Sequence, residues 1–155
     1  MLRAGDLAFL DAQRVAHLAT ADAAGHPHVV PVCFVRIGGR LYVPVDAKPK
    51  QGDPRALKRL RNLRERPEAA LLVDRYDEDW AQLRWLLVRA RAIVLEVGEE
   101  RGAALRALEQ RYPQYAAMGL AALGLPVIAL EPTAVRRWSA QAAPTARAAK
   151  DGTTA

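Results

Sequence analysis

The sequence predicts an α+β protein that is mainly β, with about six short strands in a small closed or split antiparallel barrel and a few peripheral helices. Two observations indicate this fold. Runs rich in Val, Leu and Ile recur along the chain and are separated by connectors of hairpin length. Other stretches are rich in Ala, Leu, Glu and Arg, which is the composition of helices. Strands joined mostly by hairpins favour an antiparallel sheet.

The first part of the chain contains one expected helix and three expected strands. Residues 6–16 have helical composition, with Asp6 as the N-cap. Three β-rich runs follow at residues 16–20, 28–37 and 40–45. Their short connectors predict a three-stranded meander.

The second part continues with strands at residues 69–76 and 84–97, where Arg89 and Arg91 alternate with small apolar residues. A helix is predicted over 99–112, and residues 125–138 supply one or two closing strands. The uncharged stretch 112–130 is nearly long enough to cross a bilayer. Pro and Gly residues interrupt it, so we expect a short helix followed by a buried strand.

Composition indicates one compact domain. The chain has 155 residues, of which 51% are hydrophobic, enough to bury a single core. We expect this domain over residues 1–140 and a disordered tail over 141–155, where Ala, Thr and Pro carry no periodicity. The formal net charge of +6 points to a polyanionic partner, either a nucleic acid, an anionic lipid or a phosphate-bearing ligand.

Several classes of site are not expected. Cys33 is the single cysteine, and the three histidines form no ligand pattern with it, so we expect neither a disulfide nor a metal site. The N-terminal residues lack the apolar core of a secretory signal, which predicts a cytoplasmic protein without a membrane partner.

A basic segment over residues 45–67 holds eight Lys and Arg residues against three acids. Asp53 fits an N-cap and Pro54 the first helical position, so a helix is predicted from there to about residue 66. Leu57, Leu60 and Leu63 would share the face that docks on the barrel. The opposite side and its borders would then carry cations and an amide, namely Arg55, Lys58, Arg59, Arg61 and Asn62.

Lys48 and Lys50 lie on the loop leading to the helix N-terminus, a geometry that suits a phosphate. A solvated basic face without a ligand is the alternative.

The segments "LATADAAGHPHVVPVCF", "LYVPVDAKPK", "RLRNLRERPEAALLVDRYDEDW" and "VRRWSA" carry a family resemblance. Together they resemble the pyridoxamine-phosphate-oxidase-like split-barrel flavoproteins, and in particular the deazaflavin branch that uses coenzyme F-420. The resemblance covers about residues 9–140. It implies a six-to-seven-stranded antiparallel split β-barrel with peripheral helices, and a homodimer with two cofactor sites at the interface, each built from both chains.

By this resemblance, basic residues around the loop and helix after the third strand hold the cofactor phosphate. They correspond here to Lys48, Lys50, Arg55, Lys58, Arg59, Arg61 and Asn62. Residues 59–62, "RLRN", are similar to a Lys-x-Arg-Asn run of relatives, with Arg in the first position.

The resemblance also implies which residues border the tricyclic ring of the cofactor. They are Pro31, Val32, Cys33, Val45 and Asp46. Trp80 and Trp138 are candidates for the ring or the substrate cavity, and Trp85 for the interface. All three indoles have the alternative role of filling a barrel core or a dimer seam.

The implied function is an oxidoreductase that passes hydride from reduced coenzyme F-420 to an unsaturated or quinone-like small molecule. No catalytic residue is assigned, because the cofactor donates the hydride and no acid-base dyad is required. One alternative keeps the fold and uses FMN, as an oxidase or reductase of the pyridoxamine-phosphate-oxidase type. Another is a nucleic-acid-binding module, although no helix-turn-helix, zinc-finger or base-stacking pattern accompanies the charge.

Overall fold

The computed structural model describes residues 1–46 and 52–141. Within these ranges seven strands form one antiparallel sheet in the order β2-β1-β5-β6-β7-β4-β3. The strands are β1 (Ala16–Ala21), β2 (Pro27–Val32), β3 (Val35–Ile37), β4 (Arg40–Pro44), β5 (Glu68–Arg75), β6 (Arg84–Leu95) and β7 (Val127–Ser139). The helices are α1 (Ala4–Ala12), α2 (Lys58–Glu65), α3 (Glu99–Arg111) and α4 (Pro113–Met118), with short 3-10 turns η1 (Pro54–Ala56), η2 (Trp80–Gln82) and η3 (Leu120–Leu123). The predicted mainly β split barrel is confirmed.

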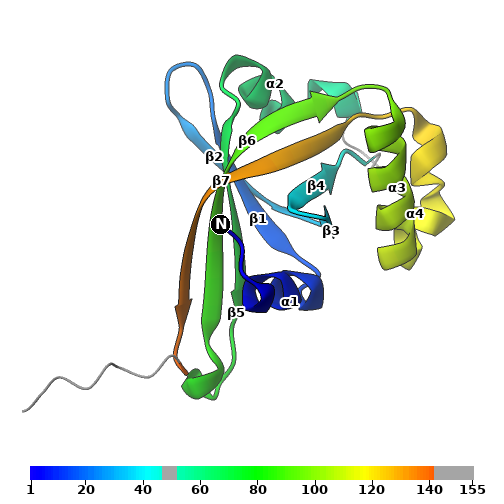
Figure 1. Cartoon of the computed structure of the whole chain (residues 1–155). Coiled ribbons are helices and arrows are strands. Elements are labelled where there is room, and N and C mark those ends of the chain that lie inside the picture. Colours follow the sequence, from blue (N-terminus) through cyan, green and yellow to red (C-terminus); the bar gives the residue numbers. More distant parts are fainter. Residues whose placement is uncertain (47–51, 142–155) are drawn as a thin grey trace, which may run out of the picture.

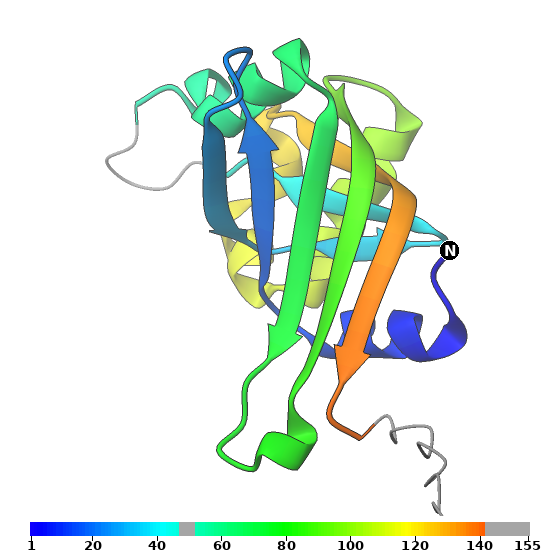
Figure 2. The same ribbon diagram turned by 90° about the vertical axis from the view of Figure 1, so that its left-hand side faces the viewer.

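The curled sheet has one face turned toward the helices and one turned away from them. Strands β2, β1, β5, β6 and β7 stand side by side in Figure 2, with the helices behind them or at their ends. In Figure 1 the lower parts of β5, β6 and β7 stand close together, the upper parts of β6 and β7 bend over toward α3 and α4, and β3 and β4 lie on that same side. None of the described helices covers the outer face of these five strands.

The hydrophobic core lies on the inner, concave side of the curled sheet, as the alternation of apolar and charged residues along β6 predicts. Leu86, Val88 and Ala90 are buried, whereas Arg89 and Arg91 point outward. A second, smaller apolar cluster joins α3 to the back of β4 and β7 through residues such as Leu108 and Val127. This second cluster holds the α3–α4 pair against the barrel, and α4 therefore has a defined place beside the strand ends.

The predicted meander is wrong at its middle strand. The run 28–37 divides at Cys33 and Phe34 into β2 and β3, which occupy opposite edges of the sheet. The backbone N–H of Phe34 donates to the Tyr112 hydroxyl at 3.1 Å rather than to a neighbouring strand. The Phe34 ring is fully buried, and the chain crosses the barrel at this point. The two hairpins β1–β2 and β3–β4 form as expected.

The N-terminal helix begins earlier than predicted, and Asp6 is not its N-cap. Helix α1 starts at Ala4, which places Asp6 in the first turn with only 2% of its surface exposed. Its carboxylate accepts from the backbone N–H of Arg3 at 2.9 Å and pairs with Arg137 at 2.9 Å and Arg84 at 3.8 Å. These donors outweigh burial and hold the pKa of Asp6 below its usual value.

The predicted basic helix is two elements. Asp53 caps the first turn as expected, since its side chain accepts from the N–H of Arg55 at 2.9 Å. However, that turn is the 3-10 element η1, and Leu57 is extended with a ψ of 137° before α2 begins at Lys58. The continuous helix over 54–66 is therefore wrong, although Leu60 and Leu63 dock on the core as predicted.

The uncharged stretch 112–130 forms a short helix and then a buried strand, as predicted. It contains α4, η3 and the first residues of β7, which is a single closing strand. Across residues 1–46 and 52–141, no helix combines the length and apolarity needed to cross a bilayer. The predicted tail lies outside the described residues except for Gln141.

Candidate functional site

Two adjoining hollows lie where β2 and β4 end, beside α2 and α4. The first, named here the β2–β4 pocket, has a volume of about 180 Å³ and is lined by Pro31, Val32, Cys33, Asp46, Arg59 and Tyr115 among others. The second, the α4 pocket, has about 590 Å³ and is lined by Arg14, Val15, Tyr112, Gln114, Tyr115 and Met118 among others. Val15, Cys33, Asp46 and Tyr115 line both. The two pockets therefore share a wall.

The residues predicted to border a cofactor ring are brought together at the β2–β4 pocket. Pro31, Val32 and Cys33 form the end of β2 and the turn after it, and Asp46 follows β4. Val45 is the exception, because it is fully buried in the core and does not line the pocket. The expected meeting of these two strand ends thus occurs although β2 and β4 are not neighbours in the sheet.

Arg59 is the cation of the β2–β4 pocket. Its guanidinium is partly buried, and its Nε is a buried donor without a hydrogen-bond partner among the described residues. Burial lowers the pKa of Arg59 below its usual value, although the negative charge of Asp46 acts in the opposite direction. Arginine nevertheless remains charged in proteins. A charged guanidinium that lines a pocket and keeps an unused donor is suited to an anionic or oxygen-bearing ligand.

Tyr115 and Asp46 form a polar pair on the shared wall. The Tyr115 hydroxyl donates to a carboxylate oxygen of Asp46 at 3.2 Å, and the side chain of Tyr115 is buried. Burial, together with Cys33 and Asp46, raises the pKa of Tyr115 well above its usual value, so the phenol keeps its proton. Sequence reasoning missed Tyr115, which lies in an uncharged stretch with no motif to single it out.

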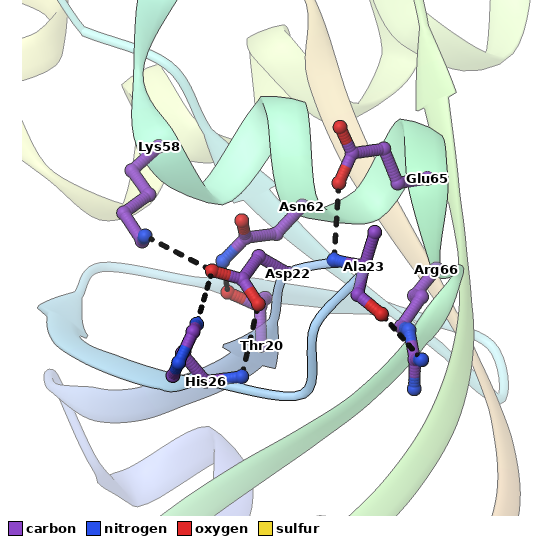
Figure 3. A network of polar contacts seen from close by, with 8 residues as sticks. All are labelled: Thr20, Asp22, Ala23, His26, Lys58, Asn62, Glu65 and Arg66. Carbon is purple, nitrogen blue, oxygen red and sulfur yellow. Dashed lines mark hydrogen bonds and ion pairs between the residues drawn. The ribbon is translucent and has the colours of Figure 1, made fainter.

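Figure 3 shows that Lys58 contacts the β1–β2 turn at Asp22, and that Asn62 contacts Thr20 near the end of β1. The Lys58 ammonium lies 3.6 Å from Asp22, whose carboxylate also accepts from the backbone N–H of His26 at 2.9 Å. The His26 backbone contact is the largest of the contacts that lower the pKa of Asp22 to about 2. Asn62 is 2% exposed and donates to the Thr20 hydroxyl at 3.0 Å. Its expected position on the outer, basic side of the helix is wrong.

The remaining basic residues divide among three situations. Arg55 donates to the carbonyl of Gly124 at 2.6 Å, and Arg64 pairs with Glu96 at 3.0 Å. Arg61 is exposed on α2. Lys48 and Lys50 lie outside the described residues. Within the described part of the chain, Arg59 is the predicted phosphate ligand that lines a pocket together with the strand ends.

Trp80 and Trp138 line neither of these pockets. Trp80 is 69% exposed in η2, at the tip of the β5–β6 hairpin, and Trp138 is 46% exposed on β7, opposite Trp85. Their contact with a ring or substrate stays a prediction. Among residues 1–46 and 52–141, no three His, Cys, Asp or Glu side chains are placed to hold a metal ion.

Comparisons with known proteins agree with this architecture. The family model described as pyridoxamine 5'-phosphate oxidase matches residues 6–139. A conserved hypothetical protein of Mycobacterium tuberculosis is similar in structure, with a TM-score of 0.74, 19% identity and coverage of 91% of this chain and 86% of that one.

Two further solved structures share the fold. The heme storage protein HutZ from Vibrio cholerae has a TM-score of 0.68 and 20% identity, over 85% of this chain and 89% of that one. A structure described as an F420 reductase has a TM-score of 0.63 and 23% identity, and the match covers 87% of this chain and 98% of that one. No curated protein matches the chain. At these identities the likeness shows the fold.

Proposed function

Because this chain belongs to the pyridoxamine 5'-phosphate oxidase family, we propose that it is an oxidoreductase that passes hydride from reduced coenzyme F-420 to an unsaturated or quinone-like small molecule. The observation that carries this proposal is the β2–β4 pocket. There Arg59, whose buried Nε has no hydrogen-bond partner among the described residues, lines the pocket together with the ends of β2 and β4 and the Tyr115–Asp46 pair. The solved F420 reductase supports the choice of cofactor by its similar fold.

The residues of the pocket fit a cofactor with a flat ring and an anionic side chain. Arg59 supplies a charged donor for a phosphate, and the exposed Arg61 lies on the same helix. Pro31 and Val32 supply an apolar edge against which a ring can rest. The net charge of +6 favours a cofactor with an acidic tail. When bound, the deazaflavin supplies the hydride.

The protein's own contribution is positioning. The buried Phe34 and its contact with Tyr112 fix the turn that carries Cys33, and the Tyr115–Asp46 hydrogen bond fixes the end of β4 against α4. Rigid walls of this kind hold two reactants in a productive orientation and thereby lower the entropic cost of the reaction. No acid-base dyad is needed for this role.

We further propose that the protein is a homodimer that pairs through the outer face of the sheet. This face carries a row of small and apolar side chains, since Ala19 is opposite Val29 and Ala70, and Leu72 is opposite Leu87. Val29 is 58% and Leu72 36% exposed in the single chain. A shallow hollow of about 440 Å³ lies over Ala19 and Ala70, between Glu68 and Arg89. Apolar side chains flanked by opposite charges are suited to a two-fold contact.

FMN is the second candidate cofactor, favoured by the description of the family. An FMN phosphate and ring use the same kinds of contact at Arg59 and β2, so the pocket admits both. The nucleic-acid alternative is disfavoured by the contacts of the basic segment. Lys58, Arg55 and Arg64 each contact an acceptor of the same chain instead of forming a free cationic face.

The reaction itself can be tested with reduced coenzyme F-420 and menadione, a flat quinone. We expect the absorbance of oxidised F-420 to appear at a rate proportional to enzyme, and reduced FMN to react more slowly. Turnover with reduced FMN but not with reduced F-420 would support the alternative that the protein uses FMN. Turnover with neither, combined with DNA or RNA binding at moderate salt, would support the nucleic-acid alternative.

A further inference from the structure

The α4 pocket has the size and position of a second ligand site. Its volume of about 590 Å³ falls within the range of small-molecule sites, roughly 300–1,000 Å³. It shares Cys33, Asp46 and Tyr115 with the β2–β4 pocket, so an occupant of one pocket contacts the wall of the other. Two reactants held in these pockets would be neighbours.

The walls of the α4 pocket are mostly apolar or aromatic. Val15, Tyr112, Pro113 and Met118 supply this surface. The polar lining residues are Tyr115 and Asp46, which are hydrogen-bonded to each other, and Arg14 and Gln114, whose side chains carry N–H donors. This distribution suits a flat, largely apolar molecule with an oxygen at one end.

The pocket is built on fixed elements. The Tyr112 and Tyr115 rings pack edge to face, with centroids 5.5 Å apart. The Tyr112 hydroxyl accepts from the N–H of Phe34, and the Arg14 guanidinium lies 5.7 Å from the Tyr112 ring centroid. Helix α4 begins at Pro113 and is capped after Met118 by Gly119, which adopts the left-handed conformation that favours glycine. A preformed pocket binds its ligand without paying for ordering.

We propose that the α4 pocket binds the acceptor substrate, and that the acceptor is a flat, apolar quinone-like molecule. This inference rests on the proposed function, because it assigns the second reactant of that reaction. It places the acceptor beside α4, and not beside Trp80 or Trp138.

Two substitutions can fill the pocket from helix α4. Gln114→Trp and Met118→Trp add an indole at residues that line it and that are exposed, so the fold should tolerate both. Ala117→Trp is the matched control, because Ala117 is an exposed residue of the same helix and does not line the pocket. Thermal unfolding of the three variants verifies that each is folded.

Equilibrium dialysis of menadione against the protein without cofactor gives a readout that does not depend on activity. We expect wild type and Ala117→Trp to bind menadione equally, and Gln114→Trp and Met118→Trp to bind it about ten-fold more weakly or worse, a loss of about 1.4 kcal/mol. The affinity for F-420 or FMN, measured separately, should stay within about two-fold in all three.

The two proposals fail in different ways. Menadione binding that is absent in wild type, or unchanged in both pocket variants, would overturn the acceptor site. Equal loss of cofactor and menadione binding would also overturn it, because both pockets would then belong to one cofactor site. Failure of wild type to bind either cofactor would remove the proposed function, while the dialysis would still decide whether the α4 pocket takes a quinone.

Discussion

The hydroxyl of Tyr115 lies 3.2 Å from a carboxylate oxygen of Asp46, and this contact joins α4 to the end of β4. The two residues are 69 positions apart in the sequence and form the wall between the β2–β4 pocket and the α4 pocket. This hydrogen bond therefore contributes to the geometry of both pockets, and its donor keeps its proton because burial raises the pKa of Tyr115.

We predict that Tyr115→Phe lowers the free energy of unfolding by about 1 kcal/mol at neutral pH, since one hydrogen bond to a carboxylate is lost. The raised pKa of Tyr115 adds a dependence on alkaline pH. The usual pKa of tyrosine is 10. Below that pH the phenol is protonated in both the folded and the unfolded chain, so Tyr115 makes its full contribution to the free energy of unfolding. Above pH 10 the unfolded chain ionises first, so stability falls as pH rises toward the folded pKa.

Urea unfolding of wild type and Tyr115→Phe at several pH values from neutral to strongly alkaline would measure this difference. The stability of wild type should fall more steeply above pH 10 than that of the variant. Parallel curves would show that Tyr115 ionises as it does in an unfolded chain.

The β1–β2 turn is predicted to loosen in acid. Contacts with His26 and Lys58 lower the pKa of Asp22 from 3.8 to about 2. The ionised Asp22 therefore stabilises the folded state above about pH 4. This contribution is lost as pH falls from about 4 through 2. Asp22→Asn should therefore be less stable than wild type at pH 7 and equal to it below pH 2 in thermal melts. The control Asp74→Asn, on an exposed part of β5, should change stability much less. A constant gap between wild type and Asp22→Asn at every pH would contradict this account.

Asn62→Ala is predicted to lower the free energy of unfolding by about 1–3 kcal/mol, because it leaves the buried Thr20 hydroxyl without its partner. Replacing both partners, as in Thr20→Val with Asn62→Leu, should recover part of this loss. Chemical denaturation of wild type, Asn62→Ala and the double variant measures these differences. If Asn62→Ala keeps its stability and loses cofactor affinity, Asn62 is a cofactor ligand and not a structural residue.

The outer face of the sheet gives a prediction about assembly. Leu72→Glu places a charge in the proposed dimer contact, whereas Ile37→Glu makes the same change at a similarly exposed position on β3. Sedimentation should show a dimer for wild type and Ile37→Glu and a monomer for Leu72→Glu. A wild-type monomer, or a dimer that tolerates Leu72→Glu, would remove this interface.

The strands were predictable where side chains alternate, as on β6 with Val88, Arg89 and Ala90, because burial follows a period of two in a strand. The division of residues 28–37 into β2 and β3 was not. The apolar run continues through Phe34, and its separation depends on the hydroxyl of Tyr112, 78 positions away. Local patterns do not record such distant partners.

The candidate site was predictable in part for the same reason. The motif series indicated the strand ends with Pro31 and Asp46, and both line the β2–β4 pocket. Asn62 was misplaced because a helical wheel with a single leucine stripe assumes one buried side. Helix α2 packs on the core through Leu60 and Leu63 and also against β1, where the buried Asn62 donates to Thr20. Arg59 lines the pocket.

The central claim is that the β2–β4 pocket binds a deazaflavin cofactor through Arg59. The most direct test is a fluorescence titration of the purified protein with coenzyme F-420 and with FMN, repeated for Arg59→Ala, Lys58→Ala and Arg64→Ala.

We expect wild type to prefer F-420 and Arg59→Ala to bind it about 10–100-fold more weakly, since one charged hydrogen bond is lost. Arg64→Ala, whose side chain pairs with Glu96, should match wild type, and Lys58→Ala should lose less than Arg59→Ala because Lys58 already faces Asp22. Absence of F-420 binding, or F-420 binding that Arg59→Ala leaves unchanged, would contradict the claim.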